Sequence, residues 1–334
     1  MRTHTLCALS ALVVSSLLPA QNWVETFTWP DGPIPPNSGW TAQSGTWAVK
    51  NGAVNQSNAA WSYLTKDNIN AYNCVVEVDC TWTAAGVQFA GVAARHIGTS
   101  ANDCVMSKIQ CNSSTPVGYD TAFCYEQPGS AVSKAGITPT PLTCRVRMVT
   151  LSGNATMSVD TDMNGSFDLV VGTKVLTAHT LPGLVGVTGY SSGAAAASPS
   201  QMDNFAYYEG VLVERTGTLP KLGQTYQMDL YTPMTQIAPY VGVASITKGT
   251  VMLSQSLGIP VGYDALFDLS LSNGNYFGLV GVTNASGVGT PGFFIPNLPQ
   301  IVGLEVFVAV ATLDATRPLG IGPVSNNLWF KITP

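Results

Sequence analysis

The segment VDTDMNGSFD concentrates oxygen ligands in a chain that has few charged residues elsewhere. Asp160, Asp162, Asn164 and Asp168 stand at relative positions 1, 3, 5 and 9, with Gly165 at position 6. This arrangement is typical of the first part of an EF-hand-like loop, in which alternate side chains converge on one Ca²⁺ and a glycine permits a sharp reversal of the chain. The spacing therefore predicts a calcium site.

The candidate calcium loop departs from an EF-hand at position 12, where Val171 replaces the bidentate glutamate. A complete EF-hand is therefore excluded. The flanking segments ATMSV and FDLVV have the composition of strands, so we expect a hairpin that one structural Ca²⁺ fastens. The alternative is an Asx-rich turn without an ion, because turns use the same residue types. Repulsion between three crowded carboxylates favours the cation.

Short runs of β-forming residues recur along the chain between Gly, Pro, Asn and Ser. In LTCRVRMV, Leu142, Cys144, Val146 and Met148 alternate with polar residues, as expected for a strand with one buried face. Runs that we interpret in the same way include NCVVEVDCTW, VQFAGVAARH and CVMSKIQC, and YDALFDLSL and GLEVFVAVATL further along the chain. The sequence predicts an all-β protein.

Cysteine and tryptophan usage changes near residues 210–220, and this change is the best domain boundary in the chain. We expect a jelly-roll sandwich over residues 21–212 and a smaller β-sandwich over residues 213–334. Residues 1–20 have the layout of a cleaved secretory signal, with a basic start and a short apolar stretch. No later stretch reaches the ~20 apolar residues of a membrane span. We therefore predict a secreted or cell-surface protein.

Six cysteines remain after the predicted signal, all within one stretch of the N-terminal domain. An even number in an exported chain favours three disulfides, and the pairing stays open. The cysteines concerned are Cys74, Cys80, Cys104, Cys111, Cys124 and Cys144. The formal net charge of −5 argues against nucleic acid or anionic lipid as a partner.

Several segments in the first two thirds of the chain resemble one known superfamily. WTAQSGTWAVKNGAVNQ, YNCVVEVDCTW, GVQFAGVAAR, RVRMVTLSGNATMSVDTDMNGSFD and GLVGVTGYSSG follow one another in the order found in concanavalin A-like lectins and glucanases, and are similar to laminin-G-like jelly rolls of secreted bacterial proteins. The resemblance covers residues 24–210. It implies two packed antiparallel sheets, an acidic hairpin loop at Asp160–Asp168 and glycan binding on a concave sheet. The C-terminal block is similar to a terminal β domain of exported planctomycete proteins.

The glucanase members of this superfamily use carboxylates that alternate on one strand. Here EVDCTW supplies Glu77 and Asp79, but the second glutamate that retaining hydrolysis requires is missing. We expect this pair to face solvent. His96 and His179 have no acidic neighbour in sequence, and we expect ordinary surface or edge positions for both. The sequence thus contains no complete catalytic set.

Four residues are candidates for ligand binding. Arg95 and His96 end a strand-like run, and Trp29 and Trp61 lie in segments that are freer to be exposed than those of the other N-terminal tryptophans. We expect a secreted, non-catalytic protein that binds extracellular carbohydrate. The alternatives are a structural or adhesive surface protein without a small ligand, and an atypical glycoside hydrolase. The oligomeric state cannot be derived from the sequence.

Overall fold

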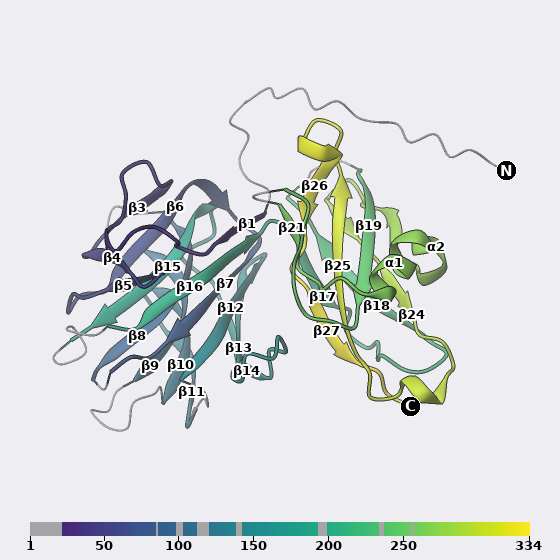
Figure 1. The fold of residues 1–334 in the computed structure, drawn as a ribbon, viewed down its shortest axis with the longest axis horizontal. Helices are drawn as coiled ribbons and strands as arrows, with labels where there is room; N and C mark the ends of the chain where they lie inside the picture. Colours follow the sequence, from purple (N-terminus) through teal and green to yellow (C-terminus); the bar gives the residue numbers. More distant parts are fainter. Residues whose placement is uncertain are drawn as a thin grey trace.

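The chain folds into two β-sandwiches that lie side by side (Figure 1). The computed structural model describes residues 22–84, 86–97, 103–111, 120–137, 142–192, 199–233, 237–254 and 257–334. The predicted all-β fold class is confirmed. The predicted signal sequence, residues 1–20, lies outside the described residues.

The first sheet of the N-terminal sandwich has nine strands within the described residues, and all of its pairs are antiparallel. Eight of them follow one another in space, and β1 pairs with β16 beside them. In spatial order they are β14 (Leu169–Val175), β13 (Asn154–Asp160), β12 (Thr143–Leu151), β7 (Cys74–Thr81), β16 (Gln201–Tyr208), β5 (Ala53–Gln56), β4 (Trp47–Lys50) and β2 (Gly32–Pro33), with β1 at Asn22–Glu25.

The second sheet of this sandwich has seven strands within the described residues, again antiparallel. In spatial order they are β11 (Ala131–Ala135), β10 (Thr121–Gln127), β9 (Cys104–Cys111), β8 (Gln88–His96), β15 (Gly183–Ser191), β6 (Ser62–Ala71) and β3 (Trp40–Ala42). In both sheets, strands far apart in sequence are neighbours. For example, β15 lies between β6 and β8, as in a jelly-roll topology.

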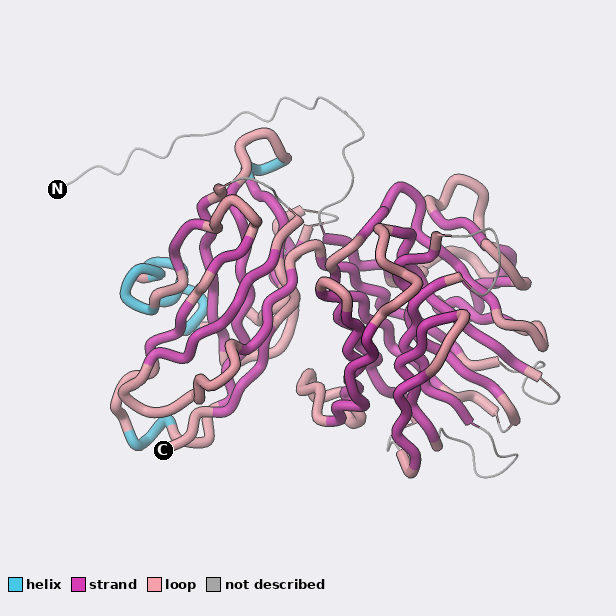
Figure 2. Tube along the Cα trace, turned by 180° about the vertical axis from the view of Figure 1, so that it is seen from behind, coloured by secondary structure: helices cyan, strands magenta, loops and turns pink. Residues whose placement is uncertain are grey.

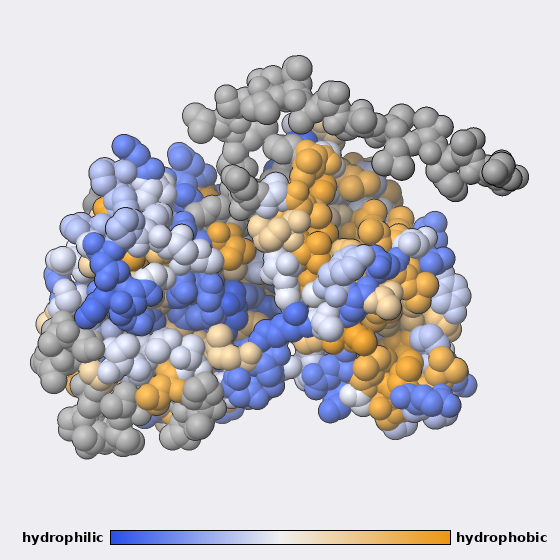
Figure 3. All heavy atoms as spheres, in the orientation of Figure 1, coloured by the Kyte–Doolittle hydropathy of each residue, from blue (hydrophilic) through white to orange (hydrophobic). Residues whose placement is uncertain are grey.

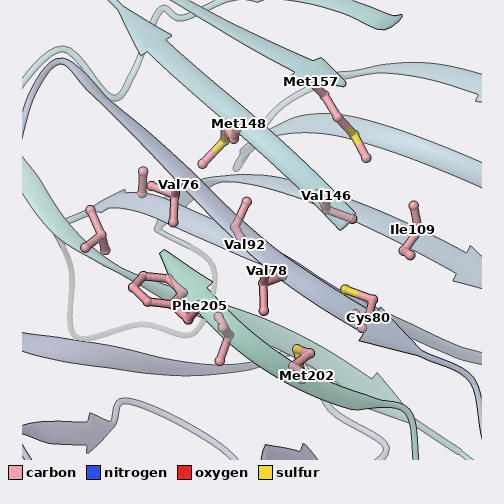
Figure 4. Close-up of a cluster of buried hydrophobic side chains, with 14 of the residues drawn as sticks. Val76, Val78, Cys80, Val92, Ile109, Val146, Met148, Met157, Met202 and Phe205 are labelled. Carbon is pink, nitrogen blue, oxygen red and sulfur yellow. The ribbon is translucent and has the colours of Figure 1, made fainter. Parts of the chain in front are cut away.

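Apolar side chains from both sheets fill the space between them (Figure 4). On β12, Cys144, Val146 and Met148 are completely buried in this core, as the alternation in the sequence predicts. The side chains of Arg145 and Arg147 lie on the opposite side of the same strand. The alternation thus fixes which side of the sheet carries the charged residues.

The C-terminal sandwich consists of a four-stranded sheet, a five-stranded sheet and a two-stranded ribbon within the described residues. Its strands are β17 (Val211–Glu214), β18 (Thr225–Tyr231), β19 (Pro239–Ser245), β20 (Val251–Met252), β21 (Gly258–Ile259), β22 (Val280–Val282), β23 (Val288–Gly289), β24 (Gly292–Phe294), β25 (Glu305–Leu313), β26 (Ile321–Val324) and β27 (Leu328–Lys331). It has its own core, which includes Tyr226, Met228 and Phe293.

One strand-like segment of the C-terminal sandwich is helical. YDALFDLSL forms α1 (Ala265–Ser272), followed by α2 (Gly274–Phe277), so the interpretation as a β run is wrong here. Asp264 caps α1 by accepting a hydrogen bond from the Phe267 N–H, and Phe267 and Ser270 are buried on one side of the helix. Figure 2 shows that the helical turns all belong to this sandwich. No helix in the described part of the chain is long and apolar enough to cross a membrane.

The six cysteines that follow residue 20 are all described and buried, and no disulfide joins any two of them. The expectation of three disulfides is therefore wrong for this structure. Cys80 and Cys144 face each other on β7 and β12, whereas Cys104 and Cys111 occupy opposite ends of β9. Burial raises the pKa of the Cys104 thiol to about 12. In such surroundings cysteine acts as a small apolar residue that fills the core, and an even number of cysteines does not imply pairing.

Candidate functional site

Aromatic side chains and one lysine share the outer side of the seven-stranded sheet. Strand pairing places them together: Phe89 lies between Tyr190 and Gln110, and Lys108 lies next to Phe123. We call this group the aromatic face, and it consists of Trp61, Phe89, Lys108, Phe123, Tyr125 and Tyr190. Its residues come from β8, β9, β10, β15 and the segment before β6.

Ring contacts connect the members of the aromatic face. The Phe89 and Tyr190 rings are stacked, with centroids 5.6 Å apart and an interplanar angle of 11°. Trp61 makes edge-on contacts with Phe89 at 5.4 Å and with Tyr125 at 5.7 Å. Trp61, Tyr125 and Tyr190 are half-buried, so part of each ring remains open to water. The rings therefore hold one another in place while still offering apolar surface, which is what a preorganised sugar-stacking surface requires.

Lys108 places a cation among these rings. Its ammonium nitrogen lies 4.0 Å from the Phe89 ring centroid, 4.3 Å from that of Trp61 and 5.2 Å from that of Phe123. It donates a hydrogen bond of 3.0 Å to the side-chain oxygen of Gln110. Cation–π attraction of this kind stabilises a partly dehydrated ammonium group. Burial lowers the pKa of Lys108 to about 8, so the side chain is still mostly protonated at neutral pH.

The sequence interpretation found one residue of this face, Trp61, and missed the others. The signal was present in TAFCYEQ, where Phe123 and Tyr125 alternate with the buried Ala122 and Cys124. In CVMSKIQC, Lys108 similarly shares a strand side with Gln110. Assembly of the face, however, depends on which strands are neighbours, and a single sequence does not specify this.

The predicted metal ligands converge in the turn between β13 and β14. Carboxylate oxygens of Asp160, Asp162 and Asp168 all lie within 4.8 Å of one another. The turn is closed by hydrogen bonds from the N–H groups of Asn164 and Gly165 to the two oxygens of Asp160, at 3.0 and 2.6 Å. Gly165 has φ +88°, a conformation that glycine adopts without strain. The loop geometry thus matches the predicted hairpin, and its donor set of carboxylates fits Ca²⁺.

The acidic turn also contacts the C-terminal sandwich. The Lys248 ammonium lies 3.9 Å from Asp160 and donates a hydrogen bond to the Met163 carbonyl. The Asp160 side chain is fully buried, and this burial raises its pKa, although the Gly165 N–H and Lys248 act in the opposite direction. The ion pair with Lys248 therefore does not offset the burial of this carboxylate.

A layer of charged residues lies between the two sandwiches. Arg145 Nε is 2.8 Å from Glu77 and its Nη1 is 2.7 Å from Asp79, and Arg147 binds Glu77 at 2.6 Å. Each arginine stands directly opposite a carboxylate in the pairing of β12 with β7. Arg147 also donates hydrogen bonds to Asn327 of the C-terminal sandwich.

The charged layer corrects the expectation that Glu77 and Asp79 face solvent. They are only 4 % and 7 % exposed, because the C-terminal sandwich covers this side of the sheet. Burial alone would raise the pKa of Glu77, but the Arg147 and Arg145 guanidinium groups hold it below its ordinary value. A cavity of about 250 Å³ lies beside the layer, with Tyr208 and Lys248 among its lining residues. Both carboxylates are thus held in ion pairs with arginine.

Arg95 and His96 lie inside the protein and not on an open face. The Arg95 guanidinium donates hydrogen bonds to the carbonyls of Tyr72, Ser152 and His179, and the residue is completely buried. His96 is 2 % exposed and its ring packs beside Tyr63 at 5.4 Å. The structure thus gives Arg95 a role in holding three loop segments together.

His179 is also buried, contrary to the expected surface position. Its Nε2 lies 2.9 Å from Asp103 and its Nδ1 lies 3.4 Å from Glu126. Trp29, the remaining ligand-binding candidate, is half-buried and makes an edge contact with Phe27 of the inter-sheet core. It therefore belongs to a different cluster from Trp61, which packs against the small group around Tyr63 on the outer side of the seven-stranded sheet.

Comparisons with known proteins find likeness in structure alone. No family model matches the chain, and no curated protein matches it by sequence. The carbohydrate binding module CBM66 from Bacillus subtilis matches with a TM-score of 0.39 and 14 % identity, over 50 % of this chain and 93 % of the module. The β-glucanase of Bacillus licheniformis matches with a TM-score of 0.38 and 12 % identity, over 57 % of this chain and 99 % of the glucanase. The exoplasmic/lumenal domain of VIP36 in its Ca²⁺/Man-bound form matches with a TM-score of 0.39 and 8 % identity, over 56 % of this chain and 88 % of that domain. No residue role passes from these proteins to this chain.

Proposed function

We propose that this protein is an exported, non-catalytic binding protein that holds polysaccharide on the aromatic face. The observation that carries the proposal is the preorganised group of half-exposed rings around Trp61 and Tyr190. Aromatic faces stack against the C–H faces of sugar rings, and their large rigid area costs little conformational entropy on binding. Neutralisation of Glu77 and Asp79 by arginine supports binding without hydrolysis. The signal-like N-terminal sequence supports a location outside the cytoplasm.

Removing rings from the aromatic face should weaken polysaccharide binding. We expect Trp61→Ala and Tyr190→Ala each to lower the affinity about tenfold or more, equivalent to about 1.4 kcal/mol or more, because each residue is half-exposed on the aromatic face and can stack on a sugar. Affinity electrophoresis against a panel of polysaccharides, followed by titration calorimetry, measures the change. Tyr276→Ala is the matched control, since Tyr276 is an aromatic residue of the C-terminal sandwich that is 65 % exposed. It should leave the affinity unchanged.

One observation favours an alternative function, a structural or adhesive role at the cell surface. Figure 3 shows orange, hydrophobic surface on the C-terminal sandwich. The exposed large apolar side chains of this sandwich include Ile237, Val282 and Leu319, which are 67 %, 61 % and 64 % exposed. If no polysaccharide of the panel binds and the intact protein sediments as an oligomer or with cell envelopes, the structural role replaces the proposed one.

We also propose that the acidic turn holds one structural Ca²⁺ through Asp160, Asp162, Asn164 and Asp168. The crowded carboxylates and the buried position of Asp160 support a cation there. Calcium that binds only the folded protein stabilises it by mass action, by about 2.7 kcal/mol at a concentration of 100 Kd. The melting temperature should therefore be higher in calcium than in EDTA.

The control for the calcium prediction is a variant without the ligand set. Asp160→Asn combined with Asp162→Asn should melt at the same temperature in calcium and in EDTA. Lys248→Gln removes the ammonium group beside Asp160, so it should strengthen the response to calcium. Identical melting curves of the wild-type protein in the two buffers would rule out the calcium site.

A further inference from the structure

Lys108 differs from the buried arginines of this protein in the groups that surround it. Arg145 and Arg147 bind carboxylates, and Arg95 binds three carbonyls. Lys108 is 4 % exposed, and among the described residues it contacts aromatic rings and the neutral amide of Gln110. All 19 Asp and Glu residues of the chain lie within the described residues, and none forms an ion pair with Lys108. The aromatic face thus contains a cation without a counter-ion.

A largely dehydrated cation with no counter-ion attracts anions strongly. Taking a charge out of water is costly, and low-dielectric surroundings screen its interaction with another charge less than water does. The rings offset part of this cost by cation–π attraction. The rest of the dehydration cost is not offset. An uncharged methionine or leucine could fill the same position among the rings and would avoid this cost. An anionic group that reaches the aromatic face recovers this free energy, whereas a neutral sugar does not.

We infer that the ligand of the aromatic face is an acidic polysaccharide, in which the rings stack on the sugar and Lys108 attracts a carboxylate or sulfate group on it. This inference rests on the proposed function and adds the class of ligand. The formal net charge of the chain is −5, so long-range attraction does not draw a polyanion to it. Discrimination must therefore come from the local charge at Lys108.

The test compares each acidic polymer with a neutral polymer of the same backbone. One arm uses polyuronates and their carboxyl-reduced forms, and the other uses sulfated galactans and their desulfated forms. The wild-type protein should bind the acidic member of at least one arm about tenfold or more tightly than its neutral counterpart. Rising salt should weaken the acidic complex and leave the neutral one nearly unchanged. The arm that responds identifies the anionic group.

Substitutions at Lys108 separate charge recognition from folding. Lys108→Met keeps an unbranched side chain of similar length without the charge, and should reduce the ratio of acidic to neutral affinity to near unity. Lys108→Arg should keep most of the preference. Equal wild-type affinity for both members of each arm, or equal loss of both in Lys108→Met, would overturn the inference and leave the proposed function intact. No binding of any polymer by the wild-type protein would overturn both.

Discussion

Replacing Arg145 by methionine is expected to lower the free energy of unfolding by about 3–5 kcal/mol, because it leaves the buried Asp79 carboxylate without its arginine and Glu77 with Arg147 alone. Arg145 binds Glu77 at 2.8 Å and Asp79 at 2.7 Å, and both carboxylates are almost fully buried beneath the C-terminal sandwich. Denaturant unfolding followed by tryptophan fluorescence measures the change. The signal reports mainly on the N-terminal sandwich, because Trp329 is the one tryptophan of the C-terminal block.

Two further variants test the cause of this loss. Arg215→Met breaks a second arginine–aspartate pair, with Asp229, in which the arginine side chain is 38 % exposed, and should cost far less stability than Arg145→Met. Adding Asp79→Asn to Arg145→Met removes the carboxylate left without a cation, while Glu77 keeps its pair with Arg147, and should restore much of the stability. If Arg145→Met costs no more than the Arg215 variant, water reaches the charged layer and its burial is not energetically significant.

The charged layer shows where sequence analysis succeeds and where it stops. Alternation along LTCRVRMV correctly separated Val146 and Met148 from Arg145, because the two sides of a strand follow from a period of two. The same alternation identified Glu77 and Asp79 as residues of the outer side. It did not reveal that a second sandwich covers that side, since domain packing leaves no local pattern. Solvent exposure was therefore the wrong expectation.

Prediction of the candidate site from the sequence was limited for a related reason. The acidic turn was predictable because its acidic residues lie within nine positions of one another, and a local loop brings them together. The aromatic face joins residues as far apart as Trp61 and Tyr190, which only the neighbour order of β6, β15, β8, β9 and β10 unites. In α1, the Asp264 cap and the spacing of Phe267 and Ser270 were present in the sequence, but short runs of leucine and alanine do not distinguish helix from strand by periodicity.

Replacing Glu126 by glutamine is also expected to lower the free energy of unfolding strongly, and the size of this loss depends on pH. Its buried carboxylate on β10 accepts hydrogen bonds from the backbone N–H groups of Thr177, Ala178 and His179, at 2.9, 2.7 and 3.0 Å. Burial by itself raises the pKa of Glu126, but these donors prevail and hold the pKa at about 2, below the ordinary value of 4.5. Glu126→Gln removes the charge and places an amide donor among N–H groups, so we expect a loss of about 2–4 kcal/mol at neutral pH.

The sign of the pH dependence follows from the lowered pKa. A carboxylate with a lower pKa in the folded state contributes stability that is fully present above 4.5 and is lost as pH falls towards about 2. The difference in melting temperature between wild type and Glu126→Gln should therefore be constant from neutral pH to about pH 5 and shrink below it. Glu305→Gln, at a half-exposed pair with Lys331, is the matched control and should change stability by less than about 0.5 kcal/mol at any pH. A difference between wild type and Glu126→Gln that stays constant down to about pH 2 would mean that the bound carboxylate does not stabilise the loop through its charge.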